Sequence, residues 1–181
     1  MSSSPGTVLL VWLLGVSAMA AEYEQTEVYT DLRQHVLSLT SDQLGIKDDN
    51  APLAVLMETG YPEAVATLVA VADGSSSLYF SDGGGIIGAG EHQRVRDQVL
   101  ELIKIAQQHL GEMHTVTEFP LPKQNHTRFY VITGNGIYSE EALEESLGLE
   151  KHVLSSVFHQ GHQLISYIRA AEEQYDAKKE N

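Results

Sequence analysis

Hydrophobic side chains recur with two different periods along this chain, and each period predicts its own kind of element. Apolar residues spaced three and four positions apart predict three helices, over Glu22–Thr40, Glu91–Gly111 and Lys151–Tyr175. Alternating or short apolar runs, rich in β-branched residues, predict strands. These runs are Leu53–Glu58, Ala64–Ala72, Ser76–Ser81, Thr115–Phe119 and Thr127–Thr133.

Shorter elements are expected between these segments. Ser41–Asn50 is polar and reads as a loop, and Ile137 is placed to start a further strand. Ser139 is placed to cap a short helix that Gly148 ends. The order of elements is therefore α-βββ-α-ββ(β)-α.

This order predicts an α+β fold with a central, mostly antiparallel sheet of five to six strands, flanked by helices. Strands joined by tight turns form hairpins, which is why antiparallel pairing is expected. A chain of 181 residues is long enough for one domain with a substantial core. We place that domain at residues 21–176 and expect a disordered polar tail at 177–181.

The first 20 residues are not expected to belong to the fold. Val8–Val16 is a short apolar run, and Ala18-Met19-Ala20 resembles the small-residue site at which a secretory signal is cleaved. No Lys or Arg precedes the run, so an over-extended start with translation from Met19 is the alternative. The first interpretation makes the protein exported, and the second makes it cytoplasmic.

The charge of the chain excludes some classes of partner. With 11 Lys and Arg against 25 Asp and Glu, the formal net charge is −14. Binding to nucleic acid or to an anionic membrane surface needs clustered cations, so neither is expected for the folded part. The chain contains no cysteine, which excludes disulfides, thiol catalysis and thiolate metal sites.

A glycine-rich stretch between the third strand and the central helix is the candidate functional site that the sequence indicates. It contains Gly83, Gly84, Gly85, Gly88 and Gly90. The pattern G-x-G-x-x-G is satisfied, but hairpins rather than a β-α-β unit surround it, which argues against a dinucleotide site. The glycines either allow positive φ angles at a tight crossing or expose backbone N–H groups to an anion or another small ligand.

Polar side chains next to these glycines extend the candidate ligand site. Asp82 precedes the glycines, and Glu91 and His92 follow them. His92 is expected in the first turn of the central helix on its core-facing side, where the helix N-terminus disfavours an imidazolium. The three side chains are expected to form a small polar cluster, with a half-buried structural histidine as the alternative.

The final helix offers two further candidates. His159 and His162 lie one turn apart, close enough in principle to share a metal ion, but a solvated helix face is the favoured explanation. Gly161 lies within the apolar stripe of the same helix, where glycine costs about 1 kcal/mol relative to alanine. We expect another backbone to pack closely there, either a partner helix at an interface or the glycine-rich stretch.

The order of elements over Glu22–Tyr175 resembles the roadblock/LC7 and profilin-like group, whose helices surround a five-stranded antiparallel sheet. This chain departs from the group by its third strand before the central helix and by its glycines. The segments SLYFSDGGGIIGAGEH and FHQGH are also similar to a family of uncharacterised bacterial proteins, which implies no activity. Roadblock-type domains dimerise and serve as interaction platforms, so the resemblance implies a binding role.

We therefore expect a non-enzymatic binding or scaffolding module that acts as a homodimer and uses no cofactor. Its partners would be a second copy of the chain and an unidentified protein or small molecule. The first alternative is a protein, either a binding protein or an enzyme, that binds a small ligand or anion at residues 83–92. The second alternative is a metal-binding protein that uses His159 and His162.

Overall fold

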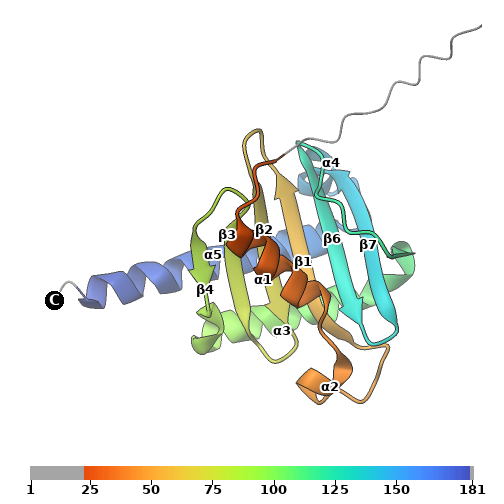
Figure 1. Ribbon diagram of the computed structural model, residues 1–181, viewed down its shortest axis with the longest axis horizontal. Helices are drawn as coiled ribbons and strands as arrows, with labels where there is room; N and C mark the ends of the chain where they lie inside the picture. The colour runs from red at the N-terminus through yellow and green to blue at the C-terminus, as the bar shows by residue number, and fades with distance from the viewer. Residues whose placement is uncertain (1–22, 180–181) are drawn as a thin grey trace, which may run out of the picture.

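The computed structural model describes residues 23–179, and across them seven strands form one antiparallel sheet with helices on both faces (Figure 1). The strands are β1 (Pro52–Gly60), β2 (Val65–Val71), β3 (Ser76–Phe80), β4 (Gly85–Ile87), β5 (His114–Val116), β6 (His126–Thr133) and β7 (Gly136–Leu143). The α-helices are α1 (Glu27–Leu37), α2 (Ser41–Leu44), α3 (Gln93–Gln108), α4 (Glu144–Gly148) and α5 (Ser155–Lys179). Two 3₁₀ turns, η1 (Ala89–Glu91) and η2 (Leu110–Glu112), flank α3.

The strands follow the order β4-β3-β2-β1-β6-β7-β5 across the sheet. Hairpins account for most neighbours, and β6 returns to pair with β1 at the centre. The α+β class and the antiparallel pairing are confirmed, but the sheet has seven strands rather than five or six. The additional strand is β4, whose Gly85, Ile86 and Ile87 pair with β3 inside the glycine-rich stretch.

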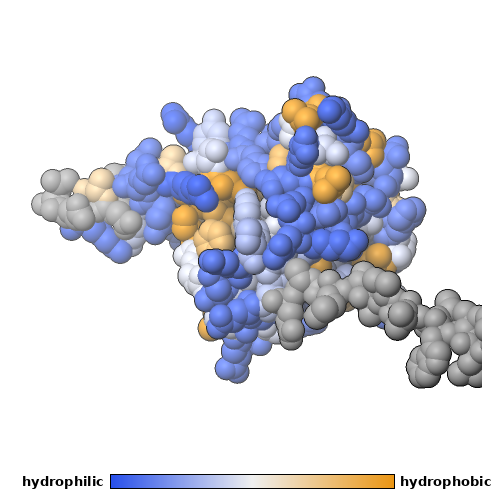
Figure 2. Space-filling model, turned by 90° about the horizontal axis from the view of Figure 1, so that it is seen from above, coloured by the Kyte–Doolittle hydropathy of each residue, from blue (hydrophilic) through white to orange (hydrophobic). Residues whose placement is uncertain are grey.

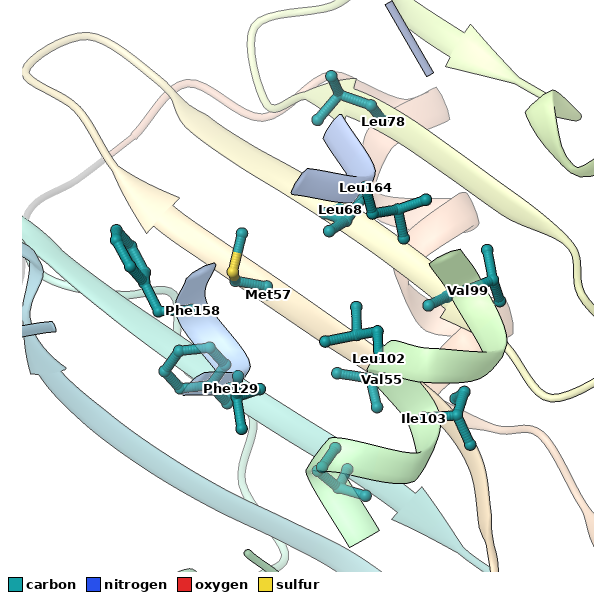
Figure 3. Packing of buried hydrophobic residues seen from close by; sticks show 14 of the residues in the cluster. Val55, Met57, Leu68, Leu78, Val99, Leu102, Ile103, Phe129, Phe158 and Leu164 are labelled. Carbon is teal, nitrogen blue, oxygen red and sulfur yellow. The ribbon is translucent and has the colours of Figure 1, made fainter. Parts of the chain in front are cut away.

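One face of the sheet packs against α3 and α5 and holds the larger core (Figure 3). The side chains of Val55, Met57, Leu68 and Phe129 extend from the strands toward this layer. They meet Val99 and Leu102 of α3 and Phe158 and Leu164 of α5. The stripes with helical spacing in the sequence therefore correspond to the buried faces of these two helices.

The opposite face of the sheet packs against α1, which lies in front of the strands in Figure 1. Tyr29, Val36 and Leu37 of the helix contact a second buried cluster that includes Leu56 and Tyr130. All nine residues of β1 are buried because both faces of this central strand are covered. A strand covered on both faces needs apolar residues at successive positions, as the run LAVLM provides.

Several boundaries differ from the predicted ones. The first helix begins at Glu27 because the hydroxyl of Thr26 accepts a hydrogen bond from the Tyr29 amide and caps it. The predicted loop at 41–50 contains α2. Ser139 does not cap a helix, because it lies within β7 and pairs with Tyr130 of β6. The helix α4 begins only at Glu144.

The final helix begins four residues later than expected and continues through Lys179. Residues 177–179, which we expected in a disordered tail, are therefore helical, whereas 180–181 lie outside the described residues. The predicted signal or over-extended start at residues 1–20 also lies outside them. Between residues 23 and 179, none of the helices has the length and apolar character needed to span a membrane.

Candidate functional site

The glycine-rich stretch carries the chain from β3 around the edge of the sheet and into α3. Residues 81–84 form a turn in which the Gly83 amide donates to the Phe80 carbonyl and the Gly84 carbonyl accepts from the Phe80 amide. The strand β4 and the turn η1 follow, and the amides of Glu91 and His92 donate to the Gly88 and Ala89 carbonyls. These N–H groups are already used within the chain, which leaves them unable to bind an anion.

Two of the glycines are required because the backbone of another segment lies so close that a side chain would not fit. A Cβ at Gly85, where φ is 144°, would lie 2.6 Å from the Cα of Tyr79 on β3. A Cβ at Gly90 would meet the Gly74 carbonyl oxygen and lie 2.8 Å from the Cα of Ser75. Both approaches occur inside the fold, so a ligand is not needed to explain these two residues.

The polar side chains beside the glycines do not converge. Asp82, Glu91 and His92 are all exposed, and no hydrogen bond or ion pair joins any two of them in the described part of the chain. The prediction of a core-facing His92 in the first helical turn is wrong: this residue is the N-cap of α3 and its side chain makes no capping hydrogen bond. The segment therefore lacks the paired groups that acid–base chemistry needs.

Exposed apolar side chains gather around β4 instead. Eight large hydrophobic residues are exposed among residues 23–179, and three of them are Val28 of α1, Ile87 of β4 and Tyr175 of α5. Ile87 is 65 % exposed although it lies in the sheet. In Figure 2, hydrophobic surface is visible at the base of the projecting helix α5. Together these residues surround the free edge of β4.

Two hollows border this edge, and Ile87 lines both of them. The first, of about 220 Å³, lies between α1 and the β3–β4 hairpin and is also lined by Val28 and Tyr79. The second, of about 310 Å³, lies between β4 and α5 and is also lined by His92 and Tyr175. The side chain of Ile87 therefore forms a ridge between two concave surfaces.

The C-terminal part of α5 runs past β4 and projects beyond the body of the molecule (Figure 1). Among the side chains that the structure describes in this helix, Ala171 is the last buried one, and Glu172, Glu173, Gln174 and Tyr175 are exposed. A helix of 25 residues is about 37 Å long, which exceeds what the sheet can cover here. One free strand edge and one free helix end thus lie on the same side of the protein.

A buried polar cluster on the α1 face was not foreseen from the sequence. Arg33 of α1 donates two hydrogen bonds, of 2.7 and 2.9 Å, to the carboxylate of Glu58 on β1. Glu58 is fully buried, and the Thr67 hydroxyl lies 3.4 Å from it. The signal that could have revealed this pair is the single carboxylate in the otherwise apolar run LAVLMET, because a buried charge requires a partner.

Tyrosines enclose this ion pair. Burial, followed by the charge of Glu58, raises the pKa values of Tyr29 and Tyr79 and raises the pKa of Tyr130 to about 12. Burial alone would lower the pKa of Arg33, but the hydrogen bonds and charge of Glu58 outweigh it, and the net shift is upward. All three phenols stay protonated at neutral pH, so this cluster stabilises α1 on the sheet and supplies no base.

The two candidate metal ligands on α5 occupy different environments. His159 is exposed, whereas His162 is half-buried with its ring 4.3 Å from the ring of Phe158. Burial, followed by the positive charges of His159 and Arg169, lowers the pKa of His162. Over residues 23–179, no group of three His, Cys, Asp or Glu side chains is placed to hold a metal ion. The pair therefore lacks a third ligand.

Gly161 is buried, and its close neighbour lies within the same core. A Cβ at this position would lie 2.5 Å from the sulfur of Met57 on β1 and 3.5 Å from Leu68 on β2. The expected neighbour was a partner helix or the glycine-rich stretch, and the structure places a side chain of the sheet there instead. The glycine lets α5 approach the sheet and does not lie on a surface that a partner could reach.

Comparison with known proteins identifies no relative: no protein-family model, no curated protein and no solved structure matches this chain.

Proposed function

We propose that this protein is a non-enzymatic binding or scaffolding module that acts as a homodimer through the β4 edge and the projecting end of α5. The observation that carries the proposal is Ile87, an apolar side chain 65 % exposed on an unpaired strand edge. Open strand edges pair readily with other chains, and soluble proteins usually protect them with charge or proline. Here β4 carries Gly-Ile-Ile instead.

A second copy of the chain suits this edge because a two-fold contact uses the same surface on both subunits. Antiparallel pairing of the two β4 strands would continue the sheet from one subunit into the other. β4 supplies only three residues and therefore few main-chain hydrogen bonds. Val28, Ile87 and Tyr175 would provide the apolar area that a stable interface needs.

The projecting helix supports the same arrangement. α5 extends beyond β4 on the side where a paired subunit would lie (Figure 1). Its free end would then cover part of the second subunit, and the corresponding helix of that subunit would cover the first. The surface near β4 carries both signs of charge, with Arg94 as well as Glu91 and Glu172, so two copies can place opposite charges together.

The architectural resemblance to the roadblock/LC7 and profilin-like group supports a binding role, since domains of that kind dimerise and serve as platforms. In both cases, helices cover an antiparallel sheet, although this sheet has seven strands. The separation of Asp82, Glu91 and His92 favours binding over acid–base catalysis. The proposal involves no cofactor, nucleic acid or membrane.

The first test is the mass of residues 21–181 at micromolar concentration, measured by light scattering after size-exclusion chromatography. We expect a dimer for the natural sequence and a monomer for Ile87→Lys. At 65 % exposure, this substitution should change the free energy of folding by no more than about 0.5 kcal/mol. Leu149→Lys is the matched control because Leu149 is 54 % exposed beyond α4, away from β4, and it should remain a dimer.

A second test locates the contact. The chain has no cysteine, so Ile87→Cys creates a single thiol. In a β4–β4 dimer in which the two copies of residue 87 face each other, oxidation should cross-link them, because a disulfide forms only when the Cα atoms approach within about 7 Å. Leu149→Cys should not cross-link. A monomeric natural protein would refute the homodimer, and a dimer that Ile87→Lys leaves intact would refute this interface.

A further inference from the structure

We infer that the cavity between α1–α2 and the β2–β3 hairpin binds a small apolar molecule that carries an amine. The cavity holds about 370 Å³, within the range of about 300–1,000 Å³ that is typical of small-molecule sites. It lies on the α1 face, at the far end of β3 from the glycine turn. It shares Tyr79 with the smaller hollow beside β4, and its Ser77 pairs with Ile87, but the proposed ligand does not depend on the dimer.

The cavity exists because the helices on this face are short. α1 ends at Leu37, and the chain then turns through residues 38–40 into the single turn of α2. The two helices leave the sheet surface over β2 and β3 partly uncovered, and side chains from both layers line the opening. The apolar part of the lining includes Leu32, Val36, Leu44, Val69, Val71 and Tyr79.

The polar part of the lining lies at the β2–β3 turn and along α1. Asp73, Ser75 and Ser77 line the cavity from the hairpin, and His35 lines it from the helix. The Asp73 carboxylate accepts a hydrogen bond from the Ser75 amide through one oxygen, at 2.8 Å, while the other oxygen is free of protein partners among the described residues. A hydrogen bond from Arg96 to the Asp73 carbonyl holds the turn in place.

These charges select the class of ligand. Asp73 is the lining carboxylate, neither Lys nor Arg lines this cavity, and the chain as a whole carries a net charge of −14. The field of such a chain attracts cations and repels anions. An apolar body would fill the space beside Leu44 and Val71, and its ammonium group would reach the free oxygen of Asp73. A fatty acid of the same size would place its carboxylate beside Asp73 and bind less well.

The test uses three probes with the same eight-carbon chain: octylamine, 1-octanol and octanoate. Each is titrated into the full chain below its micelle concentration or, for 1-octanol, below its solubility limit, and binding is followed through the backbone amide resonances of residues 69–79. We expect saturable shifts with octylamine binding most tightly and octanoate least. Absence of saturable binding would refute the site, and equal binding of the three probes would refute the assignment of an amine.

Three variants test the charge of the cavity and the space inside it separately. Asp73→Asn keeps the oxygen that accepts from Ser75 and should weaken octylamine about two- to fivefold, the range for a charge pair at an exposed carboxylate such as Asp73, without changing 1-octanol. Asp82→Asn makes the same change of net charge at the distant glycine turn and should alter neither probe. Ser77→Phe should fill the cavity and abolish binding of both probes. If Asp82→Asn weakens octylamine as much as Asp73→Asn does, the cavity does not recognise the amine.

Discussion

At the residue scale, breaking the ion pair between Arg33 and Glu58 should cause a large loss of stability. Arg33→Met leaves the Glu58 carboxylate buried with only the Thr67 hydroxyl nearby, and should lower the free energy of unfolding by roughly 3–5 kcal/mol. Replacing both residues by methionine should cost markedly less, because neither charge is then buried alone. Urea denaturation at neutral pH measures both losses.

An exposed pair provides the control for this prediction. Lys104 and Glu101 lie 3.1 Å apart on the surface of α3, with side chains that are 64 % and 44 % exposed. Lys104→Met should change stability by at most about 1 kcal/mol. If Arg33→Met lowered the free energy of unfolding by as little as Lys104→Met, the buried pair would not be what holds α1 against the sheet.

His162 predicts how stability depends on pH. Burial and nearby positive charges lower the pKa of His162 in the folded state, so below its ordinary value of 6.5 the unfolded state binds the proton more readily. Stability should therefore fall as the pH is lowered from about 6.5 toward the folded-state pKa, and this contribution should level off below it. Denaturant midpoints at several pH values measure the slope.

Two substitutions on α5 test whether His162 causes this pH dependence of stability. His162→Gln removes the titrating group and should flatten the pH dependence in this interval. His159→Gln removes an exposed histidine one turn away and should leave most of the slope in place. A profile that His162→Gln does not change would mean that another group causes the loss of stability.

At the scale of the element, the glycine-rich stretch should tolerate change unevenly. Gly90→Ala drives a Cβ into the backbone of residues 74–75, which cannot move cheaply, and should cost roughly 2–3 kcal/mol. Gly88→Ala has open space around it, so only its φ of 79° opposes the change, at about 1 kcal/mol. Thermal denaturation of the two variants should show this order, and the reverse order would contradict the packing of η1 against the β2–β3 turn.

At the scale of the whole molecule, the net charge predicts how salt affects assembly. Two chains that each carry −14 repel one another, and the proposed contact gains its free energy mainly from apolar side chains. Raising the ionic strength from about 0.05 M to about 0.5 M screens this repulsion and should tighten the dimer. Sedimentation equilibrium measures the dissociation constant. A dimer that weakens with salt would indicate an interface based on ion pairs.

Much of the architecture follows from the sequence because periodicity reports burial directly. The stripes of α3 and α5 and the apolar runs of β1, β2 and β6 predict their elements, since each buried face must be apolar. β4 carried no such signal. Gly85, Ile86 and Ile87 form a strand only because β3 lies beside them to accept the pairing.

The candidate site could be predicted only in part. The glycines drew attention to this segment, but its exposed apolar residue, Ile87, was not among the residues singled out in the sequence. Gly85 is needed because Tyr79 of β3 lies beside it, and Gly90 is needed because Gly74 of the β2–β3 turn lies beside it. Distances of this kind are set by how layers stack, and a linear pattern does not contain them.

The sequence by itself determined the α+β class, the hairpin order and the strongly acidic surface, because propensity, period and charge are local properties of the chain. The tertiary structure alone decided what each unusual residue meets. It brought Arg33 to Glu58, 25 positions away, and it placed Met57 against Gly161. It also left the edge of β4 and the end of α5 free on one side, because only the packed sheet defines which strand is last and how far a helix overhangs it.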